Sequence, residues 1–146
     1  MVRFSVAIKF TAMPVKRKPV LPSRRELHIL QALWELGEAT VEDVVQHPIS
    51  SPTPNYKTTQ TLLRIMESKG LVRHFSRGRV FVFLPQVTRE QVGRLSVQTL
   101  LKQTFSGSPA ELVVNLLAAT SIDESELEEL ESLIRNYREQ KKNDSK

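Results

Sequence analysis

The sequence contains no cysteine among its 146 residues. This absence excludes disulfide bonds, thiolate metal sites and cysteine nucleophiles together. The three histidines, His28, His47 and His74, are far apart in the chain, and none has a histidine or carboxylate partner at the spacing of metal ligands. We therefore interpret them as structural or solvated residues, and we predict no metal and no other cofactor.

Long apolar runs are also missing, so no membrane-spanning helix is predicted. Residues 1–20 lack the continuous apolar core and the cleavage-site pattern of a signal peptide. We find no glycine-rich phosphate loop, no HExxH and no nucleophile elbow, and the carboxylates at 124–131 have the pattern of a solvated helix face. We expect a cytoplasmic protein that is not an enzyme and has no small-molecule substrate.

Charged residues are abundant but unevenly distributed. Residues 1–85 contain 13 Lys and Arg against 6 Asp and Glu, whereas residues 86–146 contain 8 against 10. Overall, hydrophobic residues make up 40% of the chain and charged residues 25%, which is typical of a soluble globular protein. A basic front half beside a mildly acidic back half predicts that only the front half faces a polyanion.

The first 22 residues are predicted to form a basic, flexible arm. They contain the segment VKRKP at 15–19 and three prolines, which oppose a helix. Two interpretations remain open for this arm: it lies on phosphate, or it is a solubilising terminus.

Capping residues and apolar spacing divide residues 23–46 into two helices. The first begins after Ser23, whose capping box is completed by Glu26, and ends at Gly37. Its predicted buried face is Leu27, Leu30, Leu33 and Trp34. The second is a two-turn helix capped by Thr40 with Asp43, and its predicted buried side is Val41, Val44 and Val45. A short helix after a glycine-containing turn is typical of a helix-turn-helix.

A third helix and a hairpin complete this region. Prolines place residues 47–55 in a loop, after which residues 57–70 show apolar residues at helical spacing and end at Gly70. Two β-branched and aromatic runs follow, LVRHF and RVFVFLP, joined by SRG with Gly78 at the turn. Three helices followed by a hairpin predict a mostly α fold, a winged helix-turn-helix over residues 23–86.

The first turn of the third helix contains no acid, although acids suit the N-terminal end of the helix dipole. This composition is explained if the turn enters the major groove of DNA, where an acid would be repelled. Hydroxyl and methyl groups, a glutamine amide and cations are suited to base edges and phosphate. The residues of this helix predicted to contact DNA are Lys57, Thr58, Thr59, Gln60, Thr61 and Arg64.

The hairpin tip, SRGR, adds two arginines. Arg77 and Arg79 flank Gly78, which allows the backbone to approach phosphate or the minor groove closely. Taken separately, these features have simpler interpretations, since threonines cap helices and an Arg-Gly-Arg tip is often a solvated turn. Their joint occurrence, in winged-helix order and in the basic half of the chain, favours double-stranded DNA as the partner.

Residues 87–142 are predicted to form three more helices, followed by a tail at 143–146. Capping boxes mark their starts: Thr88 with Gln91, Ser108 with Glu111, and Asp123 with Glu126. Each helix is too apolar on one side to stand alone in water, so we predict that they pack against a second copy of the chain. The residues predicted to form this dimer interface are Leu95, Leu112, Leu116, Leu127, Leu130, Leu133, Ile134 and Tyr137.

The sequence resembles the penicillinase-repressor family (BlaI/MecI type) over residues 25–138, in the segments LHILQALWELGEATVEDVV, YKTTQTLLRIMESKGLVRHFSRGRVFVFLPQVTREQV, FSGSPAELVVNLL and IDESELEELESLI. The resemblance implies a homodimeric repressor, with an N-terminal winged helix and a C-terminal helical dimerisation region, on a palindromic operator. It also implies control by a membrane sensor-transducer with a metallopeptidase domain, in response to an antibiotic or cell-envelope signal. The family's copper-responsive branch uses C-terminal cysteines, which this chain lacks.

The resemblance further implies a cleavage site in the C-terminal helices. The family's resistance regulators are cut at an Asn-Phe bond, and the matching bond here is Asn115–Leu116, which keeps the asparagine but not the phenylalanine. The alternative for Asn115 is a polar helix residue at the edge of the dimer interface.

A different class of function is a winged-helix adaptor, in which the third helix and the hairpin dock on a protein without specific DNA binding. Acidic residues on the exposed face of the third helix would favour this alternative. Glu67 is the only acid between residues 57 and 69, so the charge pattern favours DNA.

Overall fold

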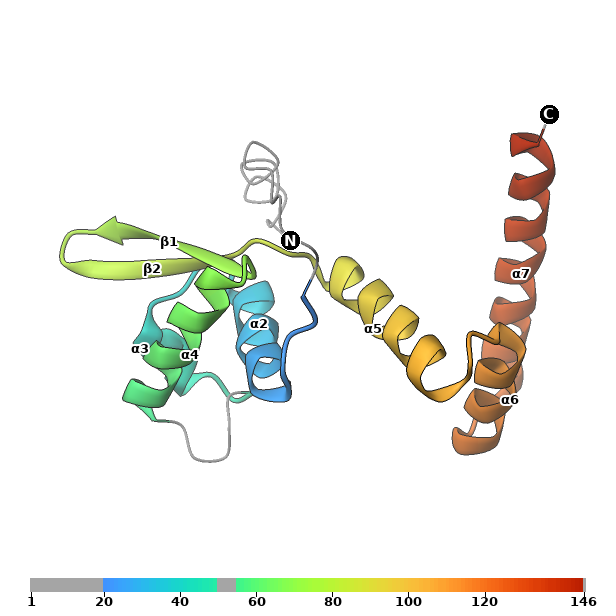
Figure 1. Cartoon of the computed structure of the whole chain (residues 1–146), viewed down its shortest axis with the longest axis horizontal. Helices are drawn as coiled ribbons and strands as arrows, with labels where there is room; N and C mark the ends of the chain where they lie inside the picture. The colour runs from blue at the N-terminus through green and yellow to red at the C-terminus, as the bar shows by residue number, and fades with distance from the viewer. Residues whose placement is uncertain (1–19, 50–54, 146) are drawn as a thin grey trace. The chain divides into compact units, whose positions relative to one another are not determined.

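The computed structural model describes residues 20–49 and 55–145 (Figure 1). Its elements are α2 (Arg24–Leu36), α3 (Val41–Gln46), α4 (Tyr56–Ser68), β1 (Val72–Arg77), β2 (Val80–Pro85), α5 (Arg89–Thr104), α6 (Pro109–Ala119) and α7 (Glu124–Asp144). Three helices followed by an antiparallel hairpin confirm the predicted winged helix-turn-helix, and the fold is mostly α. Most of the predicted basic arm, and residues 50–54 of the predicted loop, lie outside the described residues.

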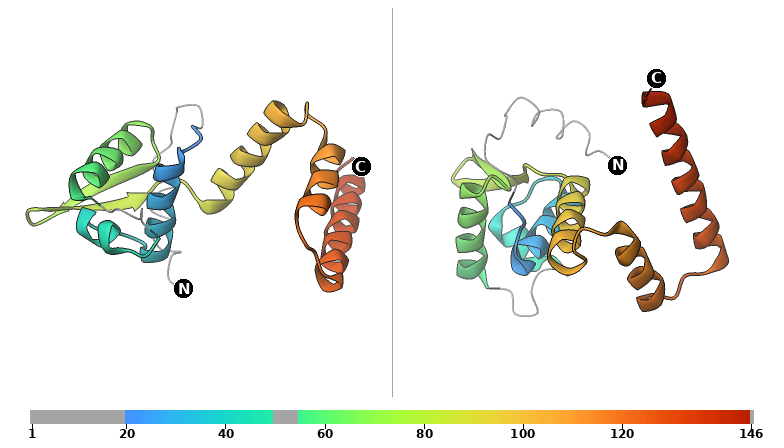
Figure 2. Two further views of the ribbon diagram at one scale, coloured as in Figure 1. Left: turned by 90° about the horizontal axis from the view of Figure 1, so that it is seen from below. Right: turned by 45° about the vertical axis from the view of Figure 1, so that its right-hand side comes forward.

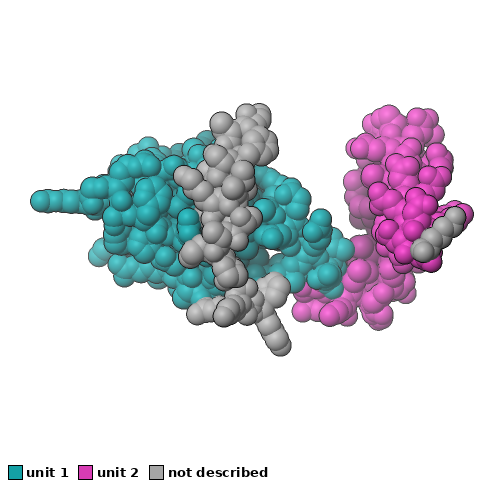
Figure 3. All heavy atoms as spheres, turned by 90° about the horizontal axis from the view of Figure 1, so that it is seen from above, with its two compact units in different colours: residues 1–98 teal, residues 99–146 magenta. Residues whose placement is uncertain are grey.

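The chain divides into two compact units, coloured separately in Figure 3. The first contains the described residues up to Gln98, and the second begins at Thr99. The boundary therefore falls within α5. Each unit is described by itself below.

Helix α2 begins and ends where the sequence predicts. The Ser23 side chain accepts a hydrogen bond from the Glu26 backbone N–H, and the Glu26 carboxylate accepts one from the Ser23 N–H, which completes the capping box. At the other end Gly37 has a φ of 85°, which glycine adopts without the penalty that a Cβ would bring. Helix α3 has the same type of start, with Thr40 and Asp43 in reciprocal bonds.

One core holds the helices of the first unit and the hairpin together, and Figure 2 shows α2, α3 and α4 side by side from two further directions. Its members are Ile29, Leu30, Ala32, Leu33, Ala39, Val41, Val44, Leu63, Met66, Leu71, Val72, Phe83 and Val92. Leu27, Trp34 and Val45 pack against it while partly buried, which confirms the apolar faces predicted for α2 and α3.

Strands β1 and β2 pair in the register Arg77 with Val80, so the turn between them has two residues. Gly78 occupies its first position with a φ of 66°, which confirms the predicted turn glycine. A further backbone segment pairs with the other edge of β2, and the sequence did not predict this pairing. Ala39, between α2 and α3, exchanges two backbone hydrogen bonds with Phe83, at 3.0 and 2.7 Å. This bridge fixes the loop that carries Glu38 against the hairpin.

The first unit continues into α5. Val92 is buried in the core, and the Trp34 indole N–H donates to the Val87 carbonyl oxygen at 2.9 Å. The Arg89 guanidinium lies 5.0 Å from the centre of the Trp34 ring. These contacts extend past the division at residue 86 that the sequence suggested.

The second unit contains the rest of α5, with α6 and α7, and none of its described residues is buried. The capping box predicted for Asp123 with Glu126 is present, as is the one for Thr88 with Gln91 at the start of α5 in the first unit. At α6 only half of the predicted box forms. The Ser108 side chain caps the Glu111 N–H, but the Ser108 N–H donates to the Phe105 carbonyl instead of to Glu111. The Ser108 N–H, which was expected to donate to Glu111, thus has its partner within the turn before α6.

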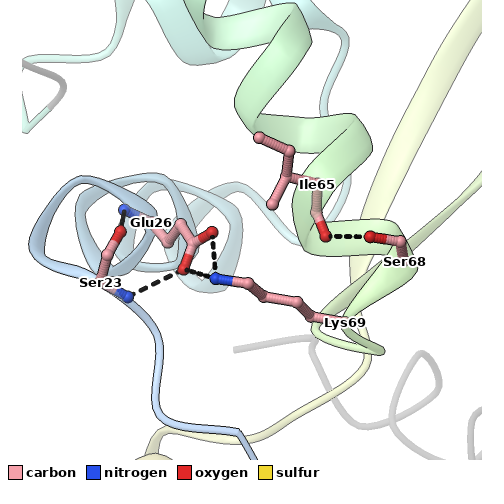
Figure 4. A network of polar contacts seen from close by, with 5 residues as sticks. All are labelled: Ser23, Glu26, Ile65, Ser68 and Lys69. Atoms are coloured by element: carbon pink, nitrogen blue, oxygen red, sulfur yellow. Dashed lines mark hydrogen bonds and ion pairs between the residues drawn. The ribbon is translucent and has the colours of Figure 1, made fainter.

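A buried ion pair joins the start of α2 to the end of α4 (Figure 4). Glu26 is 2% exposed, and both of its carboxylate oxygens accept hydrogen bonds from the Lys69 ammonium, at 2.9 and 3.0 Å. Burial raises the pKa of Glu26, but the Ser23 N–H and Lys69 together outweigh it and hold the pKa below its ordinary value of 4.5. The stabilisation by this carboxylate is therefore complete above about pH 4.5 and is lost as the pH falls through the lowered pKa.

Replacing Lys69 with methionine is expected to lower the free energy of unfolding at pH 7 by about 2 kcal/mol, less than for a fully buried pair because the Lys69 side chain is 34% exposed. Removing the cation also removes the hydrogen bond and the charge by which Lys69 lowers the pKa of Glu26, so the pKa of Glu26 is higher in the variant than in the native chain. The variant should therefore lose less stability than the native chain as the pH falls from 7 to 4. Urea unfolding at pH 7 and pH 4, followed by the fluorescence of the one tryptophan, Trp34, measures both effects. Lys102→Met is the matched control, since Lys102 is exposed in α5, and equal losses in both variants would contradict the role of the pair.

Candidate nucleic-acid interface

Helix α4 presents one polar face to solvent. Lys57, Thr58, Thr61 and Arg64 are exposed, while Gln60 is half-buried beside them. The opposite face contributes Leu63 and Met66, both 0% exposed, to the core. Because residues three and four apart share a face of a helix, packing of the apolar side on the core leaves these polar side chains directed outward. The structure therefore brings five of the six residues predicted on this helix to one accessible surface.

Thr59 is the exception among these predicted contacts. Thr59 is only 8% exposed and lies on the same side of α4 as Leu63 and Met66. A helical turn spans 3.6 residues, so a position four before Leu63 faces the core with it. The predicted contact between Thr59 and a base is therefore wrong, because its hydroxyl and methyl groups pack toward the core.

The one acid of α4 is hydrogen-bonded to the hairpin. Its cap is the neutral Asn55, whose side-chain oxygen accepts from the Thr58 N–H at 3.1 Å, and no acid lies in the first turn. Glu67, further along the helix, is bound by His74 of β1, with the imidazole Nδ1 2.7 Å from one carboxylate oxygen. The rings of Phe81 and Phe83 lie 4.4 and 5.5 Å from that imidazole. The acid of this helix is thus engaged with the hairpin.

Helix α4 starts one residue before the stretch singled out in the sequence. Tyr56 is its first residue and is 52% exposed, beside the predicted contacts. The sequence analysis missed Tyr56 as a candidate contact. The signal was present, since Asn55 is among the residues most favoured as an N-cap and sets the first helical position at 56.

The hairpin, residues 72–85, carries the two predicted arginines at its turn, and we refer to it as the wing. Arg77 and Arg79 are both exposed on either side of Gly78. The Arg77 guanidinium donates to the Glu38 carboxylate at 2.6 Å and lies 5.3 Å from the centre of the Phe75 ring. The partner of Arg77 was not predicted, because Glu38 is 39 residues away in the sequence and no local pattern links the two.

The residues predicted to form a dimer interface are accessible to different degrees. Leu95, Leu112, Leu127 and Leu130 are half-buried, whereas Leu116, Leu133, Ile134 and Tyr137 are exposed at 43–61%. Asn115 donates from its side-chain amide to the Glu111 carbonyl at 2.8 Å, one turn back in α6. Other apolar side chains of α6 are exposed as well, namely Val113, Val114 and Leu117.

Other site types are not found in the part of the chain that the structure describes. Residues 20–49 and 55–145 contain no group of three or more His, Asp or Glu side chains that could hold a metal ion. No helix within these ranges is long and apolar enough to cross a membrane.

The chain is similar to proteins of a known family. The model of the penicillinase repressor family matches residues 22–136. A penicillinase repressor of Bacillus licheniformis is 25% identical over 120 residues, which cover 82% of this chain and 94% of that protein.

Among solved structures, the chain is similar to the DNA-binding domain of the repressor BlaI, with 28% identity and a TM-score of 0.43, over 49% of this chain and 90% of that one. An ArsR family transcriptional regulator has 16% identity and a TM-score of 0.40, over 73% of this chain and 98% of that one. The family match covers most of the chain and reaches from α2 into α7. The chain therefore belongs to the penicillinase repressor family.

Proposed function

We propose that the chain is a transcriptional repressor that binds a palindromic DNA operator as a homodimer. The observation that carries this proposal is the polar face of α4, on which Lys57, Thr58, Thr61 and Arg64 are exposed together, while the one acid of the helix, Glu67, is hydrogen-bonded to His74. The name of the Bacillus licheniformis relative, a penicillinase repressor, supports the same class of function.

In this proposal α4 lies in the major groove with its N-terminal half toward the bases. Thr58, Gln60 and Thr61 supply hydroxyl groups, methyl groups and an amide that match base edges, and Gln60 is suited to a bidentate contact with adenine. Lys57 supplies a cation, which we assign to phosphate. Arg64 follows one turn later on the same face and is assigned to phosphate or guanine.

The wing supplies the second contact. Arg77 and Arg79 reach phosphate or the minor groove beside the site read by α4, and the positive φ of Gly78 allows the tight turn that presents them. Contacts with phosphate position the domain but carry no sequence information, so we assign specificity to α4 and affinity to both elements.

The second unit supports the proposed dimer because it has no buried core in the single chain. None of its described residues is buried, and the predicted interface residues of α6 and α7 leave large apolar areas in water. A second copy would cover these side chains, and the dimer would then present two recognition helices to half-sites about 10 base pairs apart. Linking the two halves raises the effective concentration of the second and strengthens binding by about 100-fold or more.

Release from DNA is assigned to loss of the dimer. The candidate event is cleavage of the Asn115–Leu116 bond by a membrane sensor-transducer with a metallopeptidase domain, after an antibiotic or cell-envelope signal. This bond lies within α6, so it becomes accessible in extended form only when the helix opens locally. Because α6 has no buried residue in the single chain, only the proposed dimer contacts oppose this opening. Cleavage would separate α7 from the DNA-binding unit.

Lys57→Ala is expected to weaken binding to DNA from upstream of the gene and to flatten its salt dependence by about 0.9 per chain, since one phosphate contact and its counterion release are lost. A mobility-shift titration with excess nonspecific competitor at several salt concentrations measures both quantities. Lys102→Ala, which removes an exposed cation outside the predicted surface, serves as the control.

An unchanged salt slope in Lys57→Ala would remove the phosphate contact from the proposal. If the native chain gives no specific shift with any genomic fragment at any salt, repressor function itself is wrong. A winged-helix adaptor for proteins then becomes the better explanation.

Leu133→Glu is expected to shift the chain from dimer to monomer, because it places a charge in the centre of the proposed apolar interface. Leu133 is 57% exposed in the single chain, so the change has little effect on folding of the monomer. Sedimentation equilibrium at several concentrations measures the change in dimer dissociation constant, expected to exceed about 100-fold. Glu128→Gln, on the same helix but off the apolar stripe, should leave the constant nearly unchanged, and an equal effect of both variants would contradict the assigned interface.

Exposure of cells to a β-lactam is expected to produce fragments ending at Asn115 and starting at Leu116, detectable by intact-mass spectrometry of the tagged protein. Asn115→Ala should remove this product, whereas Asn136→Ala, in α7, should not. The exposed position of Asn115 makes the substitution mild for the fold. Full-length protein throughout induction, with loss of repression, would show that another signal releases the DNA.

A further inference from the structure

We propose that Glu38 acts as an internal counterion that restrains the attraction of Arg77 to DNA phosphate and so limits sequence-independent binding. This inference rests on the proposed function, because it assigns a role to a residue beside the DNA-contacting surface. Glu38 makes no proposed contact with DNA itself. It acts through the charge of Arg77.

The geometry is that of an exposed, single-point ion pair. One guanidinium nitrogen of Arg77 donates to one oxygen of Glu38 at 2.6 Å, and the two side chains are 65% and 39% exposed. The Phe75 ring lies 5.3 Å from the guanidinium carbon and supports the same arrangement. A single-point contact leaves the other guanidinium N–H groups able to reach phosphate, so the pair reduces the affinity of Arg77 for phosphate without blocking it.

Backbone contacts hold Glu38 in this place independently of the pair. The next residue, Ala39, is 2% exposed and exchanges two hydrogen bonds with Phe83 of β2. The loop that carries Glu38 is therefore fixed to the same hairpin that carries Arg77. Because both partners are attached to one small sheet, the carboxylate remains near the guanidinium while DNA approaches.

This pair differs from the other ion pairs of the first unit. Glu26 with Lys69, Glu35 with His47 and Glu67 with His74 involve cations or histidines outside the proposed DNA contacts. Among the ion pairs of the described residues, only the one at Glu38 joins an acid to a residue assigned to DNA. The pair lies at the wing, and a contact between the wing and phosphate carries no sequence information. We therefore assign its effect to nonspecific binding.

The physical consequence follows from counterion release. A cation that neutralises a phosphate displaces bound salt ions, and the affinity then falls with salt by a slope of about 0.9 per contact. A guanidinium already paired with a carboxylate neutralises phosphate less effectively, and the carboxylate itself is repelled by the DNA. Removing the charge of Glu38 while keeping a hydrogen-bond acceptor should therefore raise both affinity and salt slope.

The test measures binding of the full chain to a short DNA duplex of mixed sequence at several salt concentrations. Glu38→Gln is the variant, since its amide oxygen can still accept from Arg77, and Glu90→Gln, an exposed acid in the first turn of α5, is the matched control. We expect Glu38→Gln to bind about twofold to fivefold more tightly than Glu90→Gln, the scale of an exposed ion pair, with a steeper salt slope. In an Arg77→Ala background the gain should fall below about twofold, because the cation it acts through is gone.

The outcomes separate this inference from the proposed function. If Arg77→Ala weakens binding but Glu38→Gln behaves as Glu90→Gln does, the restraint is wrong and the wing contact stands. Weaker binding by Glu38→Gln would show that Glu38 orients Arg77 for DNA, which also overturns the restraint. If Arg77→Ala leaves binding and salt slope unchanged, both the restraint and the proposed wing contact fail. Matching thermal unfolding of the variants confirms that each difference arises from the surface.

Discussion

The buried pair of Glu26 and Lys69 fixes the orientation of α4, the helix proposed to read DNA. It joins the first turn of α2 to the C-terminal end of α4, where Lys69 is the last residue before the turn into the wing. Since its apolar face is also held by the core through Leu63 and Met66, α4 has one orientation in which its polar face is outward. Charge burial is costly unless the partners are bonded, and here both carboxylate oxygens are. The same contact that stabilises the domain therefore sets the geometry of the surface proposed to read DNA.

The second unit differs from the first because it has no buried core. Its helices are well capped, by Ser108 for α6 and by Asp123 for α7, yet none of the described residues beyond Gln98 is buried. Caps decide where helices start but contribute only about 1 kcal/mol each, which does not hold exposed helices together. The first unit thus has a core of its own, whereas the second has none in the single chain. Under the proposed function, association of the second unit would supply that core and would couple DNA affinity to assembly.

Local features of the sequence predicted most of the fold, because they depend on residues within one helical turn or one hairpin. The caps at Ser23, Thr40 and Asp123 and the turn at Gly78 are of this kind. The contacts that the sequence did not reveal join distant positions: Glu26 with Lys69, Trp34 with Val87, Glu38 with Arg77, and Ala39 with Phe83. Within the candidate site, the residue types indicated the chemistry of the surface. The sequence did not show which side of α4 faces the core, so Thr59 was grouped with the outward residues although it faces inward.

The electrostatic character of the first unit depends on where its acids are engaged more than on how many there are. Each of the six acids in residues 23–86 has a partner within the chain, and these partners are Lys69, His47, Arg77, Gln46, Thr40 and His74. Only one of these partners, Arg77, belongs to the proposed DNA surface, so Lys57 and Arg64 face solvent with their charge intact. Because exposed charges act over about a Debye length of 8–10 Å, an acid relocated onto α4 would weaken the attraction of the whole face for DNA. The composition shows only the net charge of this unit. The positions at which its acids are bonded, away from Lys57 and Arg64, determine that the positive charge is concentrated on the exposed face of α4.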